Sequence, residues 1–439
     1  MWRRAVAVAP RPVLQRRAAP RALAVVAAAH SGRSGGDAGF RTGAALAGLG
    51  AAVASTTLLG LGMGPLCCDS GPSGAEYDVK VTTYNLLAPL LSDVKHFPYC
   101  APGCTEHENR WPKIVARLDK EVEGGAVIGL QEVDLLWAGK LHAYFAEHGY
   151  MAVFAQYGKP SSNYMGVMMA WPQDKYEALD VDISKIRDTA QKGLWPKAAR
   201  NSSGLTPFGY LTWNGVKEVL GCAPPEQPKD DSTFEWDKSK SRENEAVFVK
   251  LRPRGRPDQP SFCVATYHMP CLFGTPEKLR VMNIHSHLLI SKLKAFAGND
   301  AAVLMGGFNI KPWDSPYALI ESGGDLDKAA AVNAADLQGL KERLSSKKPW
   351  PMGLRSAYRE QHQKEPLFTN FAQTGGQAEP FVECLDYIWI SEALTVVGCP
   401  KLPATKEEVS GPFPNGQEPS DHLPLRATLR VSPASASKL

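Results

Sequence analysis

Six apolar segments between residues 77 and 431 each have a polar residue at one end, and this pattern constrains the fold more than any other feature of the chain. The segments contain TYN, GLQE, TYH, GGFN, LDYIW and SDH. Polar groups that arrive at the same ends of several strands are how an α/β protein builds a functional site. We therefore expect the following residues to lie close together: Asn85, Glu132, His268, Asn309, Asp386, Asp421 and His422.

The remaining segments predict a layered α/β fold. Residues 109–122 place apolar side chains on one helical face, and residues 276–297 read as a long amphipathic helix. Further apolar runs are mixed with these helices without strict alternation, which is typical of packed layers of sheet and helix. We expect one continuous domain over residues 77–431, with polar surface excursions at residues 182–242.

The first 36 residues contain seven arginines, no lysine and no acidic residue. This composition is typical of an organellar presequence, to which we assign residues 1–41; a disordered basic tail is the alternative. Removing those seven arginines from the 49 basic residues leaves 42, against 45 acidic residues, a formal charge of −3. The folded part is therefore not a generally basic nucleic-acid binder, and a polyanion would have to be held locally.

Residues 42–76 form an Ala/Gly-rich apolar segment and a linker. The uncharged part, residues 42–66, is long enough to cross a bilayer. It is interpreted as a membrane anchor, the second half of a bipartite presequence, or a flexible linker, and the sequence does not separate these alternatives.

The C-terminal tail, residues 432–439, is rich in Ser and Ala and is expected to be disordered. It ends in Ser437-Lys438-Leu439, which is a peroxisomal address. We expect a mitochondrial location from the presequence, with the peroxisome or a plastid as alternatives, and the sequence leaves the oligomeric state open.

Nine cysteines are scattered along the chain. Cys100, Cys104 and His107 have a spacing loosely like half a zinc site, but no second half follows, so free thiols are expected. An odd count without a secretory pattern also argues against a disulfide framework. His285 and His287, on the predicted long helix, are expected to be surface or packing residues and not ligands.

A set of carboxylates, amides and imidazoles of this kind suits phosphodiester hydrolysis. Glu132 and Asp421 are hard oxygen donors that match Mg²⁺ or Mn²⁺ better than zinc, and such an ion would polarise a phosphate oxygen. His422, oriented by Asp386, could activate water or stabilise the transition state. Hydrogen bonds to the phosphate would come from the remaining polar groups, Asn85, Asn309 and His268.

Each of these residues also has a simpler interpretation when taken alone. Glu132 could cap a turn, Asn85 could occupy a left-handed backbone position, and His268 could be a satisfied core histidine. Together, the seven residues at the ends of the apolar runs indicate a site.

The same segments carry a resemblance to a known family. TYNLLAP, GLQEVD, ATYHM, GGFN, CLDYIWIS and SDHLPL resemble, in this order, the motifs of the endonuclease/exonuclease/phosphatase superfamily. NEAVFVKL, LRSAYRE, EPLFTNF and FPNGQEPSDH are similar to its deadenylase-like, nocturnin-like branch. The resemblance covers residues 77–431 and implies a four-layer α/β sandwich of two packed mixed sheets flanked by helices.

The resemblance also implies a role for each residue of the set. The metal pocket would be formed by Glu132, Asp421 and Asn85. The catalytic and phosphate-contacting groups would be His422, supported by Asp386, together with His268 and Asn309, and Asn85 would contact the phosphate as well as the metal.

The chain departs from the family at one motif. The family has Gly-Asp-Phe-Asn where this chain has GGFN, so that Gly307 replaces the acid that orients the attacking water or holds a second cation. Asp314, seven residues on and past a proline, is not expected to reach back. Related sequences often also have an acid where this chain has Tyr164 and Met165. Losing a positioned base costs on the order of 10² to 10⁴ in rate.

Three hypotheses follow from the sequence. The first is a slow, divalent-metal-dependent phosphodiesterase acting on RNA 3′ ends, short oligonucleotides or a phosphorylated nucleotide. The second is a catalytically inactive relative that serves as a binding or assembly subunit in an organelle. The third is a lipid or inositol phosphatase of the same fold, which a membrane anchor at residues 42–66 would suit.

Overall fold

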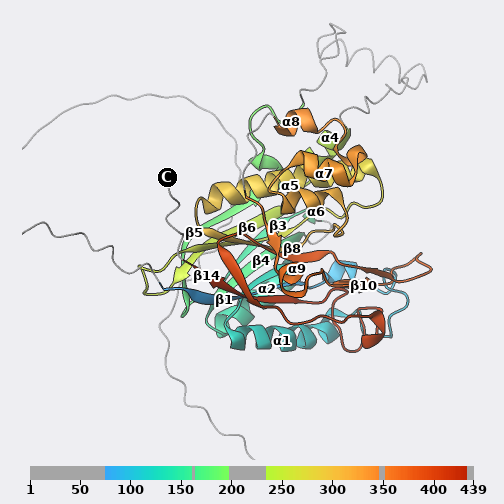
Figure 1. Cartoon of the computed structure of the whole chain (residues 1–439). Coiled ribbons are helices and arrows are strands. Elements are labelled where there is room, and N and C mark those ends of the chain that lie inside the picture. Colours follow the sequence, from blue (N-terminus) through green and yellow to red (C-terminus); the bar gives the residue numbers. More distant parts are fainter. Residues whose placement is uncertain (1–74, 161–163, 197–233, 346–351, 433–439) are drawn as a thin grey trace, which may run out of the picture. The chain divides into compact units, whose positions relative to one another are not determined.

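Two six-stranded sheets pack face to face in the computed structural model, which describes residues 75–160, 164–196, 234–345 and 352–432 (Figure 1). The strand order of the first sheet is β13 (Leu394–Gly398), β14 (Leu425–Val431), β1 (Tyr77–Asn85), β2 (Val127–Gln131), β4 (Met165–Pro172) and β3 (Tyr150–Tyr157). The order of the second sheet is β5 (Tyr176–Lys185), β6 (Glu245–Pro253), β7 (Phe262–His268), β8 (Ala301–Gly307), β12 (Asp386–Ile390) and β9 (Arg355–Ser356). A small third sheet pairs β10 (Asn370–Ala372) with β11 (Phe381–Glu383).

Both large sheets are mixed. Neighbouring strands are antiparallel, except for one parallel pair inside each sheet, β1 with β2 and β7 with β8. A parallel pair brings the carboxyl ends of two strands to the same edge of a sheet, and this arrangement positions the site described below.

Helices cover the outer faces of the two sheets (Figure 1). α1 (His107–Gly124) and α2 (Leu135–Glu147) pack on the first sheet. The second sheet is covered by α5 (Pro276–Ala297), α6 (Ser315–Glu321) and α7 (Leu326–Val332). The shorter helical segments are α4 (Phe234–Lys240), α8 (Lys341–Ser345), α9 (Ala357–His362), η1 (Pro89–Leu91), η3 (Ile186–Thr189), η5 (Ala334–Leu337) and η6 (Lys406–Glu408). The expected four-layer α/β sandwich is confirmed.

The core between the two sheets is built from alternate strand residues. Val79 and Val81 of β1 and Val247 and Val249 of β6 all point into it and are almost fully buried, as the two-residue period of a strand requires. Gly129 of β2 lies at a close approach of the two sheets, because a Cβ atom there would come within about 3 Å of the Met305 and Thr266 side chains of the second sheet. A larger residue would force these side chains to shift.

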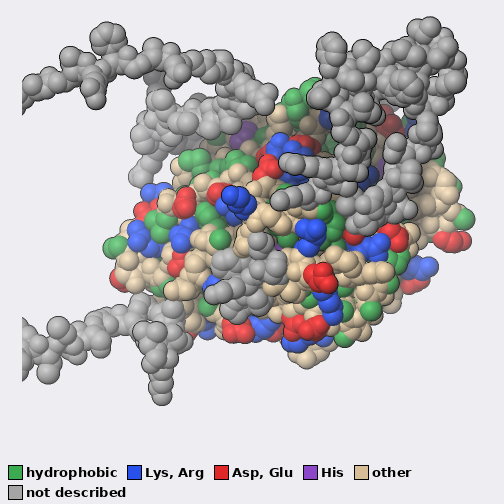
Figure 2. All heavy atoms as spheres, turned by 90° about the horizontal axis from the view of Figure 1, so that it is seen from above, with side chains coloured by type: hydrophobic (Ala, Val, Ile, Leu, Met, Phe, Trp, Pro, Cys, Tyr) green, Lys and Arg blue, Asp and Glu red, His purple; other side chains and the backbone are tan. Residues whose placement is uncertain are grey.

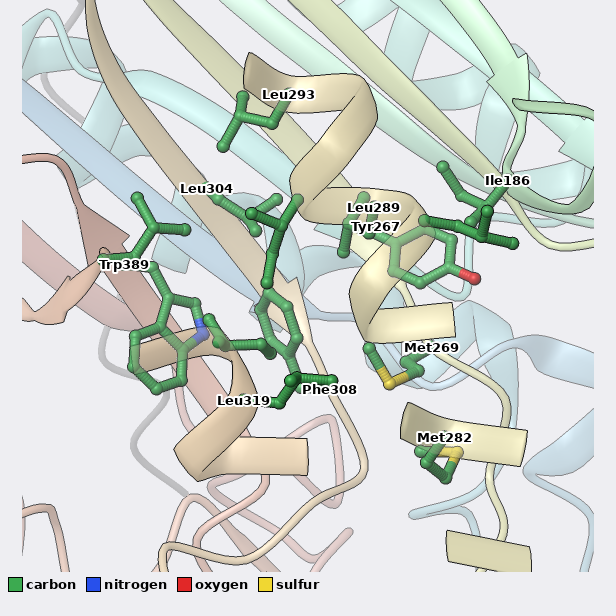
Figure 3. Packing of buried hydrophobic residues seen from close by; sticks show 14 of the residues in the cluster. Ile186, Tyr267, Met269, Met282, Leu289, Leu293, Leu304, Phe308, Leu319 and Trp389 are labelled. Atoms are coloured by element: carbon green, nitrogen blue, oxygen red, sulfur yellow. The ribbon is translucent and has the colours of Figure 1, made fainter. Parts of the chain in front are cut away.

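The long helix α5 is more buried than an amphipathic helix would be. Residues 281–290 are all buried, because the second sheet lies on one side and α4, α6, η3 and η5 pack around the others. Figure 3 shows Leu289 and Leu293 of this helix near Leu304 of β8. The expectation of an exposed polar face was therefore wrong for its central turns.

Both histidines of α5 are packing residues. The side chain of His285 is fully buried, with Nδ1 3.0 Å from the Tyr267 hydroxyl and Nε2 3.2 Å from the backbone oxygen of Ser239. His287 is also buried. Burial lowers the pKa of each imidazole to about 4, so both are neutral in the folded protein at pH 7.

The expectation of a surface excursion at residues 182–242 was wrong at both ends. The segment up to Lys185 completes the edge strand β5, where its backbone pairs with β6. Ile186 and Trp236 are buried in the core beneath α5. Residues 197–233 lie outside the described part of the chain.

The targeting segments also lie outside the described residues. They belong to residues 1–74 and 433–439, so the presequence, the anchor at residues 42–66 and the peroxisomal address remain predictions. Across the four described ranges, no helix combines the length and apolar character that crossing a membrane would need.

We expect His285 and His287 to contribute a loss of stability as the pH falls from 7 to 5, while Glu245 and His422, whose pKa values are raised, contribute in the opposite direction. The folded-state pKa values of His285 and His287 are near 4, whereas a histidine in the unfolded chain titrates near 6.5. The unfolded chain therefore binds protons in this range that the folded chain does not, and each costs about 1.4 kcal/mol of stability per pH unit.

Urea denaturation at pH 7 and at pH 5 gives the change in unfolding free energy between the two pH values. In His287→Leu this change should be less destabilising than in the parent by roughly 2 kcal/mol. His96→Leu, at an exposed position, is the matched control for a new leucine. An unaltered pH dependence in His287→Leu would contradict the assignment.

Candidate active site

Two of the predicted residues leave the first sheet side by side. β1 and β2 pair Asn85 with Gln131 in register, which places Glu132 next to Asn85. The side-chain N–H of Asn85 donates to Oε1 of Glu132 over 3.0 Å, and the backbone N–H of Ala88 donates to Oε2 over 3.0 Å. Both oxygens of Glu132 are thus held in place by neutral donors. Its backbone has a φ of 55°, in the left-handed region, where a non-glycine residue is uncommon and often functional.

A row of three residues crosses the same end of the second sheet. His268 of β7 and Asp386 of β12 are both paired with Gly307 of β8, so the central residue of the row has no side chain. A Cβ atom at Gly307 would lie 3.2 Å from Asp386 Oδ1 and from His268 Cδ2, which is tight but not blocked. Gly306 differs, because its φ is 147° and a Cβ there would lie 1.9 Å from the backbone oxygen of Tyr267. Only Gly306 is required to be a glycine.

Asp386 orients His422, as predicted. Oδ2 of Asp386 accepts a hydrogen bond from Nδ1 of His422 over 2.7 Å and a second from the Thr369 hydroxyl over 2.6 Å. Oδ1 of Asp386 is buried and has no hydrogen-bond partner among the described residues. The carboxylate therefore uses one oxygen for the imidazole and leaves the other facing the space beside Gly307.

The electrostatic surroundings of His422 favour the imidazolium form. Burial alone would lower its pKa, but the charges of Asp386 and Asp421 outweigh burial and raise the pKa to about 10. A protonated imidazole cannot act as a base, so of its two predicted roles this arrangement favours stabilisation of a negatively charged transition state.

Asp421 lies near the Nε2 side of the His422 ring, opposite Asp386, which binds Nδ1. Its Oδ2 accepts from the side-chain N–H of Asn370 over 3.1 Å and lies 3.9 Å from Nε2 of His422. Burial raises the pKa of Asp421, and the charge of Glu132 adds to this effect. The hydroxyl of Ser420 donates to the backbone oxygen of Asn85 over 2.7 Å and so links the two ligand-bearing loops.

His268 and Asn309 lie between these groups. Nε2 of His268 is 3.3 Å from Nδ2 of Asn309 and 3.8 Å from Oε1 of Glu132. Nδ2 of Asn309 also donates to the backbone oxygen of Met269 over 2.8 Å, which fixes the amide. Burial lowers the pKa of His268, and this effect is larger than the opposing effect of the Glu132 charge, so the imidazole is neutral. All seven predicted residues are therefore brought to one site.

Three supporting residues were missed. The Tyr157 hydroxyl lies 3.1 Å from Nδ1 of His268, and the side chain of Asn244 donates to the backbone oxygen of His268 over 2.8 Å. Thr369, in the EPLFTNF segment, holds Asp386. Their partners are 17 to 111 residues away in sequence, and no spacing rule connects them.

The donor set at this edge suits one hard divalent cation. The side chains of Glu132 and Asp421 remain 11% and 14% exposed, and Mg²⁺ is usually held by one or two carboxylates with waters and substrate phosphate completing its shell. Within the described ranges, no group of three or more Cys, His, Asp and Glu residues forms a metal site. A cation here would therefore also need Asn85, water or substrate, and its identity as Mg²⁺ or Mn²⁺ remains a prediction.

Three other sequence features play no part in this site. Cys100 and Cys104 are free thiols, as expected, and His107 makes an ion-pair contact with its neighbour Glu108. Asp314 accepts from the backbone N–H of Lys311 in its own turn and, as expected, does not replace the missing acid. At the beginning of β4, neither Tyr164 nor Met165 supplies a carboxylate.

A partly exposed aromatic cluster was not predicted. Trp313 is 63% exposed, and the ammonium group of Lys311 lies 5.6 Å from the ring centres of both Trp313 and Phe381. The ring of Phe381 lies 5.9 Å from that of Phe273. We call Phe273, Lys311, Trp313 and Phe381 the aromatic cluster. Its members come from the segments next to His268, Asn309 and Asp386 in sequence, and an exposed tryptophan just after a strand end was the only sequence signal.

We expect Asp386→Asn to lower the pKa of His422 by about 1–3 units, because burial is then opposed by one charge fewer. NMR titration of the His422 side chain in metal-free buffer measures the change directly. Asp314→Asn, which also removes a partly buried carboxylate, is the control and should leave the titration of His422 in place. A parent His422 that titrates near 6.5 would show that the charge coupling is wrong.

Comparison with known proteins gives the chain a family. The model of the Endonuclease/Exonuclease/phosphatase family matches residues 83–422. Carbon catabolite repressor protein 4 homolog 4 of Arabidopsis thaliana is 31% identical over 187 residues, which are 40% of this chain and 39% of that protein. Nocturnin of Drosophila melanogaster is 29% identical over 192 residues, which are 43% of this chain and 28% of that protein. The chain thus matches less than half the length of either relative.

The fold is shared with a solved structure. ANGEL2, described as a 2′,3′-cyclic phosphatase and solved in complex with adenosine-2′,3′-vanadate, has a TM-score of 0.56 at 18% identity, covering 81% of this chain and 96% of ANGEL2. The expected likeness to the nocturnin-like branch is confirmed by the relatives above. Since the family model covers well over half of the residues, this chain belongs to the Endonuclease/Exonuclease/phosphatase family.

Proposed function

We propose that the chain is a Mg²⁺- or Mn²⁺-dependent phosphodiesterase that acts on RNA 3′ ends, short oligonucleotides or a phosphorylated nucleotide. The observation that carries this proposal is the meeting of Glu132 and Asp421 with the hydrogen-bonded pair His422–Asp386 at one sheet edge. Carboxylates that can hold a divalent ion, next to imidazoles and amides that can bind phosphate, are the groups that phosphoryl chemistry needs.

Each group has a distinct part in the proposed reaction. The metal ion, when bound by Glu132, Asp421 and Asn85, would supply charge that polarises the phosphate and offsets the negative charge of the transition state. His422, held protonated by its neighbours, would donate from Nε2 to the phosphoryl group. His268 and Asn309 would orient the same group, with the Asn309 amide held by its hydrogen bond to the backbone oxygen of Met269 and by its contact with Nε2 of His268.

Gly307 makes the proposed enzyme slow. The row His268–Gly307–Asp386 lacks the carboxylate that would orient an attacking water. Asp386 is poorly placed to substitute, because its Oδ2 already binds His422 and Thr369 and its Oδ1 is buried. We expect a rate on the order of 10² to 10⁴ below that of a complete site.

The aromatic cluster supports a nucleotide over an inositol or lipid phosphate. Exposed aromatic rings next to a phosphate site can stack on a nucleobase, and such stacking is worth about 1–3 kcal/mol per base. Lys311 adds a cation, which pairs with Glu383 in the structure and would exchange that partner for a phosphate. The substrate should be short, because the chain after its first 36 residues has a formal charge of −3, whereas a long nucleic acid needs a continuous basic track. On the face drawn in Figure 2, basic and acidic side chains are interspersed.

A catalytically inactive binding or assembly subunit is the alternative that Gly307 favours. A lipid or inositol phosphatase is a further alternative, but it gives no role to the exposed aromatic rings. The mitochondrial location and the membrane anchor at residues 42–66 remain predictions that accompany any of these functions.

Gly307→Asp should raise the rate of phosphodiester hydrolysis at least tenfold, within the range expected for a positioned base. The backbone permits the change, because Gly307 is not in the left-handed region and a Cβ there needs only small movements of His268 and Asp386. Initial rates with short RNAs, 2′,5′-linked oligomers and phosphorylated dinucleotides in Mg²⁺ and in Mn²⁺ are the measurement.

Two variants separate the carboxylate from other effects. Gly307→Ala adds the Cβ without a charge and should give no increase, while Glu132→Gln should abolish activity in both the parent and the Gly307→Asp background. If Gly307→Asp is no faster and calorimetry detects no Mg²⁺ binding to the parent, the chain is a binding subunit. If Glu132→Gln retains a robust parental activity, the assignment of the site is wrong.

Replacing Phe381 or Trp313 by Ala should raise the KM for a nucleotide substrate by roughly tenfold and change kcat much less, because one stacking contact is lost. Steady-state kinetics with a base-containing and an abasic phosphodiester measure the difference, and the abasic substrate should be insensitive. Phe234→Ala removes another exposed aromatic ring, outside the cluster, and is the control. A similar loss with both substrates would show that the cluster has only a structural role.

A further inference from the structure

A fully buried arginine lies behind the site. Arg110 of α1 has no exposed surface, and its guanidinium group donates from Nη2 to the backbone oxygens of Leu86 and Leu87 and from Nε to that of Pro419. The indole of Trp137 covers the group at 5.7 Å. All three acceptors are backbone carbonyl groups, so Arg110 is not one half of a simple ion pair.

The three carbonyl groups belong to the two loops that carry the proposed metal ligands. We call these the Asn85 loop (residues 85–88) and the Asp421 loop (residues 419–422). Within the Asn85 loop, the N–H of Ala88 donates to Glu132, so this loop also positions the other carboxylate. The loops are some 330 residues apart in sequence, and the guanidinium group touches both at once.

The positive charge of Arg110 interacts with the carboxylates of the site. Burial lowers its pKa to about 10, and the charges of Tyr84, Asp421 and Glu132 limit the fall, so the group is still a cation at pH 7. A buried cation without such partners would be strongly destabilising. Its Nη1 atom has no hydrogen-bond partner among the described residues, which leaves the two loops and the nearby carboxylates as the groups that justify its burial.

We propose that Arg110 is a positioning residue that holds the Asn85 and Asp421 loops at the spacing at which Glu132 and Asp421 can share one divalent cation. The inference rests on the proposed function, because it assumes that these two carboxylates bind the ion. Two effects of Arg110 oppose one another. Its positive charge repels a cation, whereas its three hydrogen bonds keep the ligands in register. We infer that positioning is the larger effect, since residues that orient metal ligands typically contribute 10- to 100-fold in affinity.

The sign of the change in Mg²⁺ affinity decides between the two effects. Arg110→Met removes both the charge and the hydrogen bonds, and Arg110→Lys keeps the charge but loses the planar fork that reaches both loops. If positioning dominates, both variants bind Mg²⁺ about 10- to 100-fold more weakly, with Lys the milder change. If charge repulsion dominates, Arg110→Met binds Mg²⁺ more tightly than the parent, and the proposal is overturned.

Calorimetric titration of the full chain with Mg²⁺ tests this, at a temperature at which circular dichroism shows parent and variants equally folded. Arg117→Met is the matched control. Arg117 lies on the same helix and forms a partly exposed ion pair with Glu418 next to the Asp421 loop, so its loss should change the Mg²⁺ affinity less than about threefold. Equal losses in the Arg110 and Arg117 variants would show that any disturbance of the helix has this effect, and would overturn the proposal.

A second link between the loops keeps the test decisive if the Arg110 variants do not fold. Ser420→Ala breaks the 2.7 Å hydrogen bond between the two loops and leaves Arg110 in place. It should weaken Mg²⁺ binding by at least threefold, and unaltered binding would count against loop positioning.

Glu132→Gln distinguishes a failure of the proposed function from a failure of the role of Arg110. If the parent binds Mg²⁺ and Glu132→Gln binds it equally well, the proposed function fails; if Glu132→Gln loses the ion while the Arg110 variants keep parental affinity, only the role of Arg110 fails.

Discussion

The side chain of Gln131 connects the two sheets directly beneath the site. Its amide oxygen accepts from the Thr83 hydroxyl on β1, and its amide nitrogen donates to the Thr266 hydroxyl on β7. All three groups are buried, where an unpaired polar atom is costly, so the sheets are held in one relative position. Gly129, on the same strand, permits that position by leaving room for the opposing side chains. Because Glu132 follows Gln131 and His268 lies two residues beyond Thr266, this contact sets the distance between the halves of the site.

The site contains buried charges of both signs, which stabilise one another. Glu132, Asp386 and Asp421 lie in one region with two buried cations, His422 and Arg110. Carboxylates in such surroundings are stable only when hydrogen bonds and opposite charges compensate for the lost water. A divalent cation would complete the compensation at Glu132 and Asp421, while Oδ2 of Asp386 is already paired with His422. The missing acid at position 307 therefore affects the orientation of a nucleophile more than the binding of an ion.

Much of the fold was predictable because its strands are short apolar runs with a two-residue period. The segments around Asn85, His268 and Asp386 became strands as expected, and their ends met as expected, since strand ends follow from local pattern. The errors arose where burial depends on distant partners. The polar face expected for α5 is covered by α4 and α6, and the first residues of the expected surface excursion at residues 182–242 pair with β6 in an edge strand. Short elements such as β10 and β11 form by pairing with each other, and β10 also pairs with segments near His422 and Phe413; no local pattern indicates them.

The sequence by itself determined which chemical groups stand at the strand ends, that position 307 lacks a side chain, and to which family the order of motifs belongs. These follow from local pattern, because the residue types at the ends of the apolar runs and the order of the motifs are read directly along the chain. Only the tertiary structure decided that His422 is protonated, that Asp386 keeps one oxygen free beside Gly307, and that Arg110 joins two loops from opposite ends of the domain. Each of these depends on through-space distances between residues that are far apart along the chain. Hydrogen bonds and charge interactions are set by such distances and not by sequence separation.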